Sequence, residues 1–131
     1  MKDETKKWLD YADENLRSAR LLLDGELFNP CLQNVQQAVE KILKAVLVES
    51  AIKIKKTHSI NKLVSILSQN NLNVDITEDE QDLLDSIYLP SKYPLGSILP
   101  DFEPDLQTCR QCIAVADRVW DSVASFLSWD S

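Results

Sequence analysis

The stretch 31–58 constrains the fold more than any other part of the chain, because its apolar residues repeat at the three- and four-residue spacing of an amphipathic helix. About 22 helical residues would reach about 33 Å, enough to cross a small domain. Polar residues follow each other at near four-residue steps on the other side. The apolar stripe is Val35, Ala38, Val39, Ile42, Ala45 and Val46, and the polar stripe is Gln33, Gln37, Lys41 and Lys44. We therefore predict that one face builds a core and that the other meets solvent, a partner or a ligand.

Length and composition indicate one helical domain. The chain has 131 residues, which is enough to bury a core without a metal or disulfides. Only 2 glycines in a chain that is 44% hydrophobic and 27% charged favour helices over strands and tight turns. We predict an all-α fold, an up-and-down bundle of four to five helices, with residues 1–131 as a single domain.

Capping and stop signals divide the chain into five helices. The first is predicted over 3–24, with Asp3 or Thr5 as its cap, and the second opens at Asn29-Pro30 and ends in the lysine-rich piece 53–56. A third helix is predicted after a cap at Thr57 or Ser59, with its stop at 70–71. Residues 77–80 form a capping box before a short fourth helix, and a last helix is predicted from about 104 to 128. Four prolines break regular structure between 90 and 104, a segment expected to pack on the bundle.

The cysteines and the hydropathy pattern bear on location and on metal sites. No apolar run approaches the length of about 18 residues that spans a bilayer, and the N-terminus lacks the apolar core of a signal peptide. The odd number of 3 cysteines disfavours a disulfide framework. Cys109 and Cys112 form a CxxC but lie inside an apolar stripe without further ligands, so we predict that they pack in the core. We expect a cytoplasmic protein without a metal site and without a membrane partner.

The charge is distributed unevenly along the chain. The net charge is −7, which argues against a protein that coats DNA, because phosphate neutralisation favours a basic surface. Residues 41–74 nevertheless hold six lysines against one acid, whereas residues 75–131 hold twelve acids against three basic residues. A basic corner of this kind could hold a small anion or an RNA end. The alternative is that both are simply solvated charged surfaces.

His58 is the only histidine, which restricts acid–base mechanisms. No glycine-framed serine or cysteine offers a nucleophile elbow, and neither glycine lies in a phosphate-loop motif. Lys56 and Thr57 precede His58 at the expected start of a helix, so these residues could cradle a phosphate. Alternatively, His58 could merely fix the loop through a hydrogen bond. Tyr88 and Tyr93 bracket the proline-rich segment and could stack on a base, whereas Trp8 and Trp120 lie on core stripes.

Four segments form a series in a fixed order. They are an N-terminal helix with Trp8 and the run Asn15 to Leu22, then Gln36-Gln37-Ala38-Val39-Glu40-Lys41 with Lys44-Ala45, then Lys56-Thr57-His58, and finally Tyr88 with Lys92-Tyr93-Pro94. In this order the segments resemble the HEPN family, the higher-eukaryote and prokaryote nucleotide-binding domain. The resemblance covers nearly the whole chain, and the second and third segments contribute most to it.

The resemblance implies a four- to five-helix bundle that forms a homodimer. In the small prokaryotic form it also implies a separately encoded minimal nucleotidyltransferase as partner in a toxin–antitoxin-like module, and contact with a nucleotide or RNA. Family members that cut RNA resemble one another in an arginine followed four to six residues later by histidine, and this chain lacks that motif. Where relatives show Arg-Tyr-Pro, this chain has Lys92-Tyr93-Pro94, which keeps the charge but loses the bidentate fork.

These observations predict a HEPN-like protein that binds a nucleotide or an RNA end and has no catalytic residues, no metal and no cofactor other than a bound nucleotide. The predicted binding residues are Lys56, Thr57, His58, Lys92, Tyr88, Tyr93, Gln37 and Lys41. One alternative is a metal-independent RNase that uses Lys92 and His58. A second is a protein-interaction module that inhibits a partner and binds no nucleotide.

Overall fold

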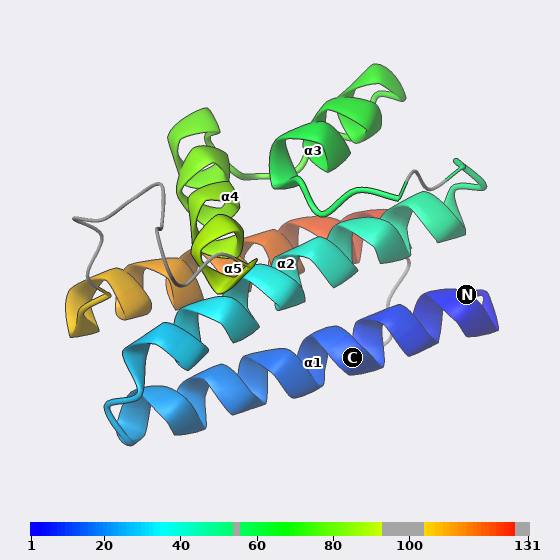
Figure 1. Cartoon of the computed structure of the whole chain (residues 1–131). Helices are drawn as coiled ribbons and strands as arrows, with labels where there is room; N and C mark the ends of the chain where they lie inside the picture. The colour runs from blue at the N-terminus through cyan, green and yellow to red at the C-terminus, as the bar shows by residue number, and fades with distance from the viewer. Residues whose placement is uncertain (54–55, 93–103, 128–131) are drawn as a thin grey trace.

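The computed structural model describes residues 1–53, 56–92 and 104–127, with the backbone alone for 89–92. These residues form five α-helices (Figure 1). The helices are α1 (Asp3–Asp24), α2 (Phe28–Glu49), α3 (Ile60–Gln69), α4 (Glu78–Lys92) and α5 (Leu106–Leu127). The all-α prediction is confirmed, and over the described ranges no strand is present.

Helix α2 is the centre of the molecule. It contacts each of the other four helices, and α1 lies on one side of it while α3 and α4 lie on the other (Figure 1). The connection between α1 and α2 is short, so the two helices run antiparallel and pack along their length. Helix α5 packs against both α2 and α1. Because α2 has neighbours on several sides, its buried residues are not confined to one stripe.

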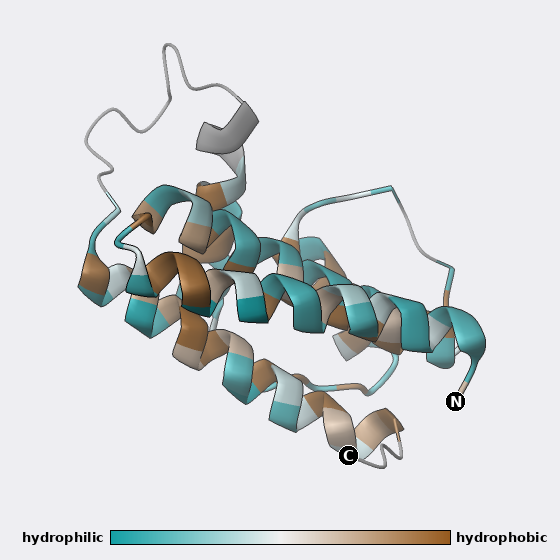
Figure 2. Cartoon of the chain, turned by 90° about the horizontal axis from the view of Figure 1, so that it is seen from below, coloured by the Kyte–Doolittle hydropathy of each residue, from teal (hydrophilic) through white to brown (hydrophobic). Residues whose placement is uncertain are grey.

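The three long helices form the layered body of the bundle, and α4 stands across them (Figure 1). Figure 2 shows that most of the ribbon of α1 is hydrophilic. Trp8 and Trp120 are half-buried and pack against the core, as the stripes predicted. Among the described residues, no helix is long and apolar enough to cross a membrane.

Helix α1 ends at Asp24, as predicted, and helix α2 ends earlier than predicted. At the end of α1 the amide of Leu27 donates to Leu22 O (2.9 Å) and Glu26 N donates to Leu23 O (3.0 Å), which is the Schellman pattern. The residue in the left-handed region is Glu26, with φ 58°, and not the neighbouring glycine. Helix α2 ends in the same way, with Ala51 at φ 56°.

Helix α2 is therefore shorter than predicted. It ends at Glu49 and does not run into the lysine-rich piece 53–56. The carboxylate of Glu49 instead accepts hydrogen bonds from Lys2 N (3.0 Å) and Thr5 Oγ1 (2.9 Å) at the start of α1. The cap of α1 is thus supplied by a distant residue, and neither Asp3 nor Thr5 caps the helix with its own side chain.

The caps of α3 and α4 match the sequence signals. Ser59 caps α3, where its Oγ accepts from Lys62 N (3.2 Å). Thr77 and Glu80 form the predicted capping box at the start of α4: Glu80 N donates to Thr77 Oγ1 (3.1 Å) and Thr77 N donates to Glu80 Oε1 (2.9 Å). Arg118 of α5 also donates to Glu80, so this cap ties α4 to α5.

The proline-rich segment begins later than predicted. Helix α4 continues past Pro90 to Lys92, because a proline near the end of a helix removes only one of the last backbone hydrogen bonds. Helix α5 begins at Leu106, with Asp105 accepting from Thr108 N (2.7 Å). The predictions for 93–103, including Tyr93, and for 128 lie outside the described residues.

All three cysteines are buried in the core, as predicted. Burial raises the pKa of Cys109 and of Cys112 to about 12. Burial also raises the pKa of Cys31, although a hydrogen bond with Cys109 opposes the change. These thiols consequently behave as small apolar side chains.

Candidate functional site

An open cavity of about 470 Å³ lies between the segment that leads into α3 and the middle of α4. Its lining combines two lysines, a histidine, two hydroxyl groups, a carboxylate and a phenol. The lining residues are Lys56, Thr57, His58, Ser59, Lys62, Asp85 and Tyr88. This size and mixture suit a small polar ligand or one end of a larger one.

His58 is held in this cavity from three directions. The Nε2 group of Gln36 donates to His58 O (3.3 Å), and His58 Nδ1 lies 3.1 Å from Glu40 Oε1. The ring of Tyr88 stacks on the imidazole with a centroid separation of 4.8 Å and an interplanar angle of 21°. The His58 side chain nevertheless remains 53% exposed, so a ligand can reach it.

A stripe of buried polar residues on α2 supports His58. Gln36, Glu40 and Lys44 are 1%, 3% and 7% exposed, and Lys44 Nζ donates to Glu40 Oε2 at 2.9 Å. The Lys44 ammonium also lies 5.6 Å from the centre of the Trp8 ring on α1. Among the described residues, every buried side-chain nitrogen or oxygen has a partner.

The position of Lys44 corrects the predicted polar face of α2. The sequence spacing placed Lys44 with Gln37 and Lys41 on an open surface, whereas the structure buries it. The reason is that α1, α3, α4 and α5 all pack on α2, so few of its residues remain open to solvent. Gln37 and Lys41 are half-buried.

The first backbone donors of α3 are already in use. Asp85 of α4 accepts hydrogen bonds from Ile60 N (2.6 Å), Asn61 N (3.2 Å) and Ser59 Oγ (3.0 Å). A helix start favours an anion, and here the anion is a carboxylate of the protein itself. A phosphate in the cavity would therefore depend on side chains, in contrast to the expected cradle of backbone donors.

The structure brings together half of the predicted binding residues. Lys56, Thr57, His58 and Tyr88 all line the cavity. Lys92 lies four residues after Tyr88, in the last turn of α4, and its side chain is outside the described residues, as is all of Tyr93.

Gln37 and Lys41 do not line the cavity. Gln37 Nε2 donates to Gln36 Oε1 (2.8 Å), so it reaches the site only through Gln36. Lys41 Nζ donates to Asn15 Oδ1 (2.7 Å) on α1 and lies 5.8 Å from the Tyr11 ring. Burial lowers the pKa of Lys41, which nearby acids only partly oppose. These two residues connect helices and lie apart from the candidate site.

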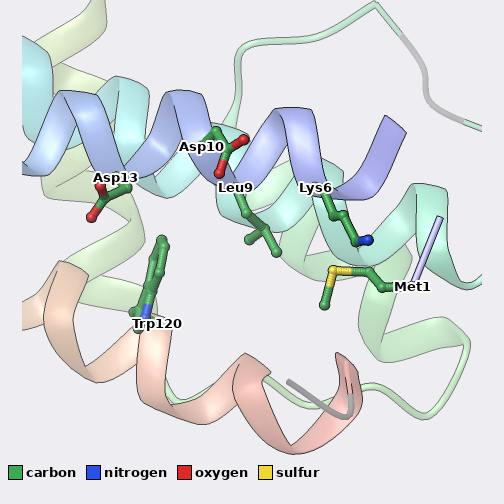
Figure 3. Close-up of a pocket in the computed structure, with 6 residues that line it drawn as sticks. All are labelled: Met1, Lys6, Leu9, Asp10, Asp13 and Trp120. Carbon is green, nitrogen blue, oxygen red and sulfur yellow. The ribbon is translucent and has the colours of Figure 1, made fainter. Parts of the chain in front are cut away.

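A second cavity, of about 280 Å³, lies between α1 and α5 and is shown in Figure 3. It is lined by Met1, Lys6, Leu9, Asp10, Asp13 and Trp120. It contains none of the predicted binding residues, and its two carboxylates against one lysine are unfavourable for phosphate. In the part of the chain that the structure describes, no group of three or more His, Cys, Asp or Glu side chains could hold a metal ion.

Sequence reasoning missed four residues of the site: Gln36, Glu40, Lys62 and Asp85. Gln36, Glu40 and Lys44 follow at four-residue steps on a helix that is apolar on most other sides, and this is the signal that could have indicated a buried polar stripe. Asp85 has no comparable signal, because its role depends on how α4 crosses the start of α3.

Comparisons with known proteins agree with the motifs and the fold. The sequence model of the HEPN domain matches residues 5–126. The crystal structure of ST0689, described as an archaeal HEPN homologue, is 25% identical with a TM-score of 0.73, covering 97% of this chain and 99% of that one. The protein TT1696 from Thermus thermophilus shares the fold, with 24% identity and a TM-score of 0.75 over 95% of this chain and 98% of that one. No curated protein sequence matches the chain. Because the family match spans most of its length, the protein belongs to the HEPN domain family.

Proposed function

We propose that the cavity between the start of α3 and α4 binds a nucleotide or an RNA end. Lys56, Lys62 and His58 would meet phosphate, together with Lys92 as predicted from the sequence, and Tyr88 or Tyr93 would meet a base. The observation that carries this proposal is the juxtaposition of two lysines with a stacked histidine and tyrosine around about 470 Å³ of open space. Membership of a family named for nucleotide binding supports it.

The charge balance of the cavity favours an anionic ligand. Lys56 and Lys62 face one carboxylate, that of Asp85, which is already engaged by three donors. Glu40 also lies near His58, and Lys44 balances its charge at 2.9 Å. The cavity therefore has an excess of positive charge, and lysine side chains can follow a phosphate without a rigid geometry.

Binding is tested by isothermal titration with ATP, GTP and a short oligoribonucleotide. The double variant Lys56→Ala with Lys62→Ala is expected to weaken binding at least about a hundredfold, because each of the two charged hydrogen bonds contributes about 1.5 kcal/mol or more. For RNA, the slope of log affinity against log salt is expected to fall by about 1 to 1.5. The matched control is Lys7→Ala, which removes an exposed lysine on α1. Absence of saturation with every ligand, or equal losses in the control, would contradict the proposal.

The homodimer and the nucleotidyltransferase partner are further parts of this proposal and rest on the family resemblance. Light scattering of the purified protein measures its mass in solution, and a mass of one 14.9 kDa chain at all concentrations would exclude the homodimer. Coexpression with a minimal nucleotidyltransferase encoded beside this gene tests the partner. If the two proteins do not copurify, with or without nucleotide, the partner proposal is wrong.

A second candidate function is RNA cleavage with His58 as an acid or base. The specific observation in its favour is the Glu40–His58 contact of 3.1 Å, since catalytic histidines are commonly oriented by a carboxylate. Incubation with a panel of RNAs decides between the two functions: cutting that His58→Ala abolishes would favour the enzyme, and binding without cutting would favour the binding protein.

A further inference from the structure

The carboxylate of Glu40 is the meeting point of the buried stripe. Lys44 Nζ donates to Oε2 at 2.9 Å, and Gln36 Nε2 donates to Oε1 at 3.4 Å. The imidazole Nδ1 of His58 lies 3.1 Å from Oε1 and 3.3 Å from Oε2. Glu40 is only 3% exposed, so water does not compete strongly for these contacts. A buried carboxylate with three nitrogen neighbours has a defined orientation.

We propose that Glu40 is a positioning residue that fixes the tautomer of His58 and thereby makes anion binding in the cavity dependent on a proton. The claim about anion binding rests on the proposed function. The claim that Glu40 fixes the tautomer of His58 concerns the protein without any ligand.

The tautomer follows from the chemistry of Glu40. Glu40 forms a salt bridge with Lys44 at 2.9 Å, and an ionised carboxylate only accepts hydrogen bonds. His58 Nδ1 must therefore carry the hydrogen and donate it to Glu40. In the neutral ring Nε2 is then a lone-pair acceptor, and among the described residues no hydrogen bond to Nε2 is present.

A phosphate oxygen is also an acceptor, so a neutral His58 with Nδ1 engaged has nothing to offer it. Contact between Nε2 and phosphate requires a second proton, which makes the ring a cation between two anions. Among the described residues, the other charged or titratable groups around His58 are Lys56 and Lys62 on its own segment, Asp85 and Tyr88 on α4, and Glu40 with Lys44 on α2. Binding of an anion through His58 is consequently expected to take up one proton.

The first experiment observes His58 directly. Because it is the only histidine, long-range proton–nitrogen correlation spectra of the uniformly labelled protein show one imidazole. The neutral ring of the wild type is expected to carry its hydrogen on Nδ1. In the double variant Glu40→Gln with Lys44→Met, which removes the buried charges together, we expect the other tautomer or a mixture. If the neutral ring of the wild type carries its hydrogen on Nε2, or if the double variant keeps it on Nδ1, the inference is wrong.

The second experiment measures the affinity for a short oligoribonucleotide without terminal phosphates, since its phosphodiesters do not titrate between about pH 6 and about pH 8. The affinity of the wild type is expected to fall by up to about tenfold for each unit of rising pH over the range in which free His58 is neutral. In Glu40→Gln with Lys44→Met the dependence should be much weaker, because a neutral ring can then donate from Nε2. Equal pH dependence in the wild type and the double variant would refute the proton coupling. If the RNA binds neither the double variant nor the wild type at any pH, the proposed function fails, and the spectra still decide the role of Glu40.

Discussion

Replacing Glu40 by glutamine tests the ion pair in the middle of α2. The side chains of Lys44 and Glu40 are only 9% and 4% exposed, so the charge left on Lys44 would have little access to water. Removal of one partner of a buried pair typically lowers the free energy of unfolding by about 3 to 5 kcal/mol. In a chain of this length, each kcal/mol lost from the free energy of unfolding lowers Tm by about 4 °C, so we expect Tm to fall by about 12 to 20 °C.

Urea denaturation followed by circular dichroism measures this change, with the slope checked against the wild type. The double variant Glu40→Gln with Lys44→Met should recover stability to within about 1 kcal/mol of the wild type, because neither buried charge of the pair then remains. Asp13→Asn is a matched control: the Arg17–Asp13 pair has the same spacing, but its side chains are 67% and 51% exposed, so the expected loss is below about 0.5 kcal/mol. If Glu40→Gln lowers the free energy of unfolding no more than Asp13→Asn does, the buried Glu40–Lys44 pair does not stabilise the protein as we infer.

Three further predictions concern the core and the helix ends. Burial raises the pKa of Cys109 and Cys112 from 9.0 to about 12, so native protein at about pH 8 should resist alkylation by iodoacetamide, and rapid alkylation would contradict the burial of these thiols. Because the thiols of the unfolded chain lose their protons at lower pH than those of the native protein, the free energy of unfolding should fall as the pH rises above about 9. Thr77→Ala removes the acceptor for Glu80 N and should lower the free energy of unfolding in urea by about 1 kcal/mol, whereas an unchanged midpoint would show that the capping box contributes little. Glu26→Gly should raise the free energy of unfolding by up to about 1 kcal/mol, because Glu26 has φ 58°. Gly25→Ala should leave it unchanged or raise it slightly, because Gly25 has φ −84° and an added Cβ would meet no atom closer than 3.7 Å. If Glu26→Gly destabilises the protein and Gly25→Ala destabilises it too, Glu26 is not the left-handed residue.

The helices could be predicted from the sequence because their signals are local. The capping box at Thr77 and Glu80 and the cap at Ser59 involve residues within three positions of one another, and both are present. The end of α2 was placed too late because Ala51 occupies the left-handed position of its Schellman motif, where the sequence offers neither glycine nor asparagine.

The candidate site could be predicted only in part. Lys56 and His58 are close in the sequence and adjoin a helix start, so local patterns indicate them. Glu40 and Asp85 join the site through contacts 18 and 25 residues apart in the sequence, and such contacts depend on how the helices cross. The spacing of Lys44 is ambiguous, because Lys44 continues the four-residue steps of the buried Gln36 and Glu40 and also lies three residues after Lys41, which remains partly exposed.

The carboxylate that Asp85 places on the first amides of α3 also affects how this part of the molecule opens. Helix starts usually fray, and their amides exchange with solvent without wider unfolding. Here the amide hydrogens of Ile60 and Asn61 are bonded to a carboxylate of α4, so we expect them to exchange mainly when α3 and α4 separate. Their hydrogen-exchange rates therefore report the parting of two short helices, and with it the widening of the rim around His58.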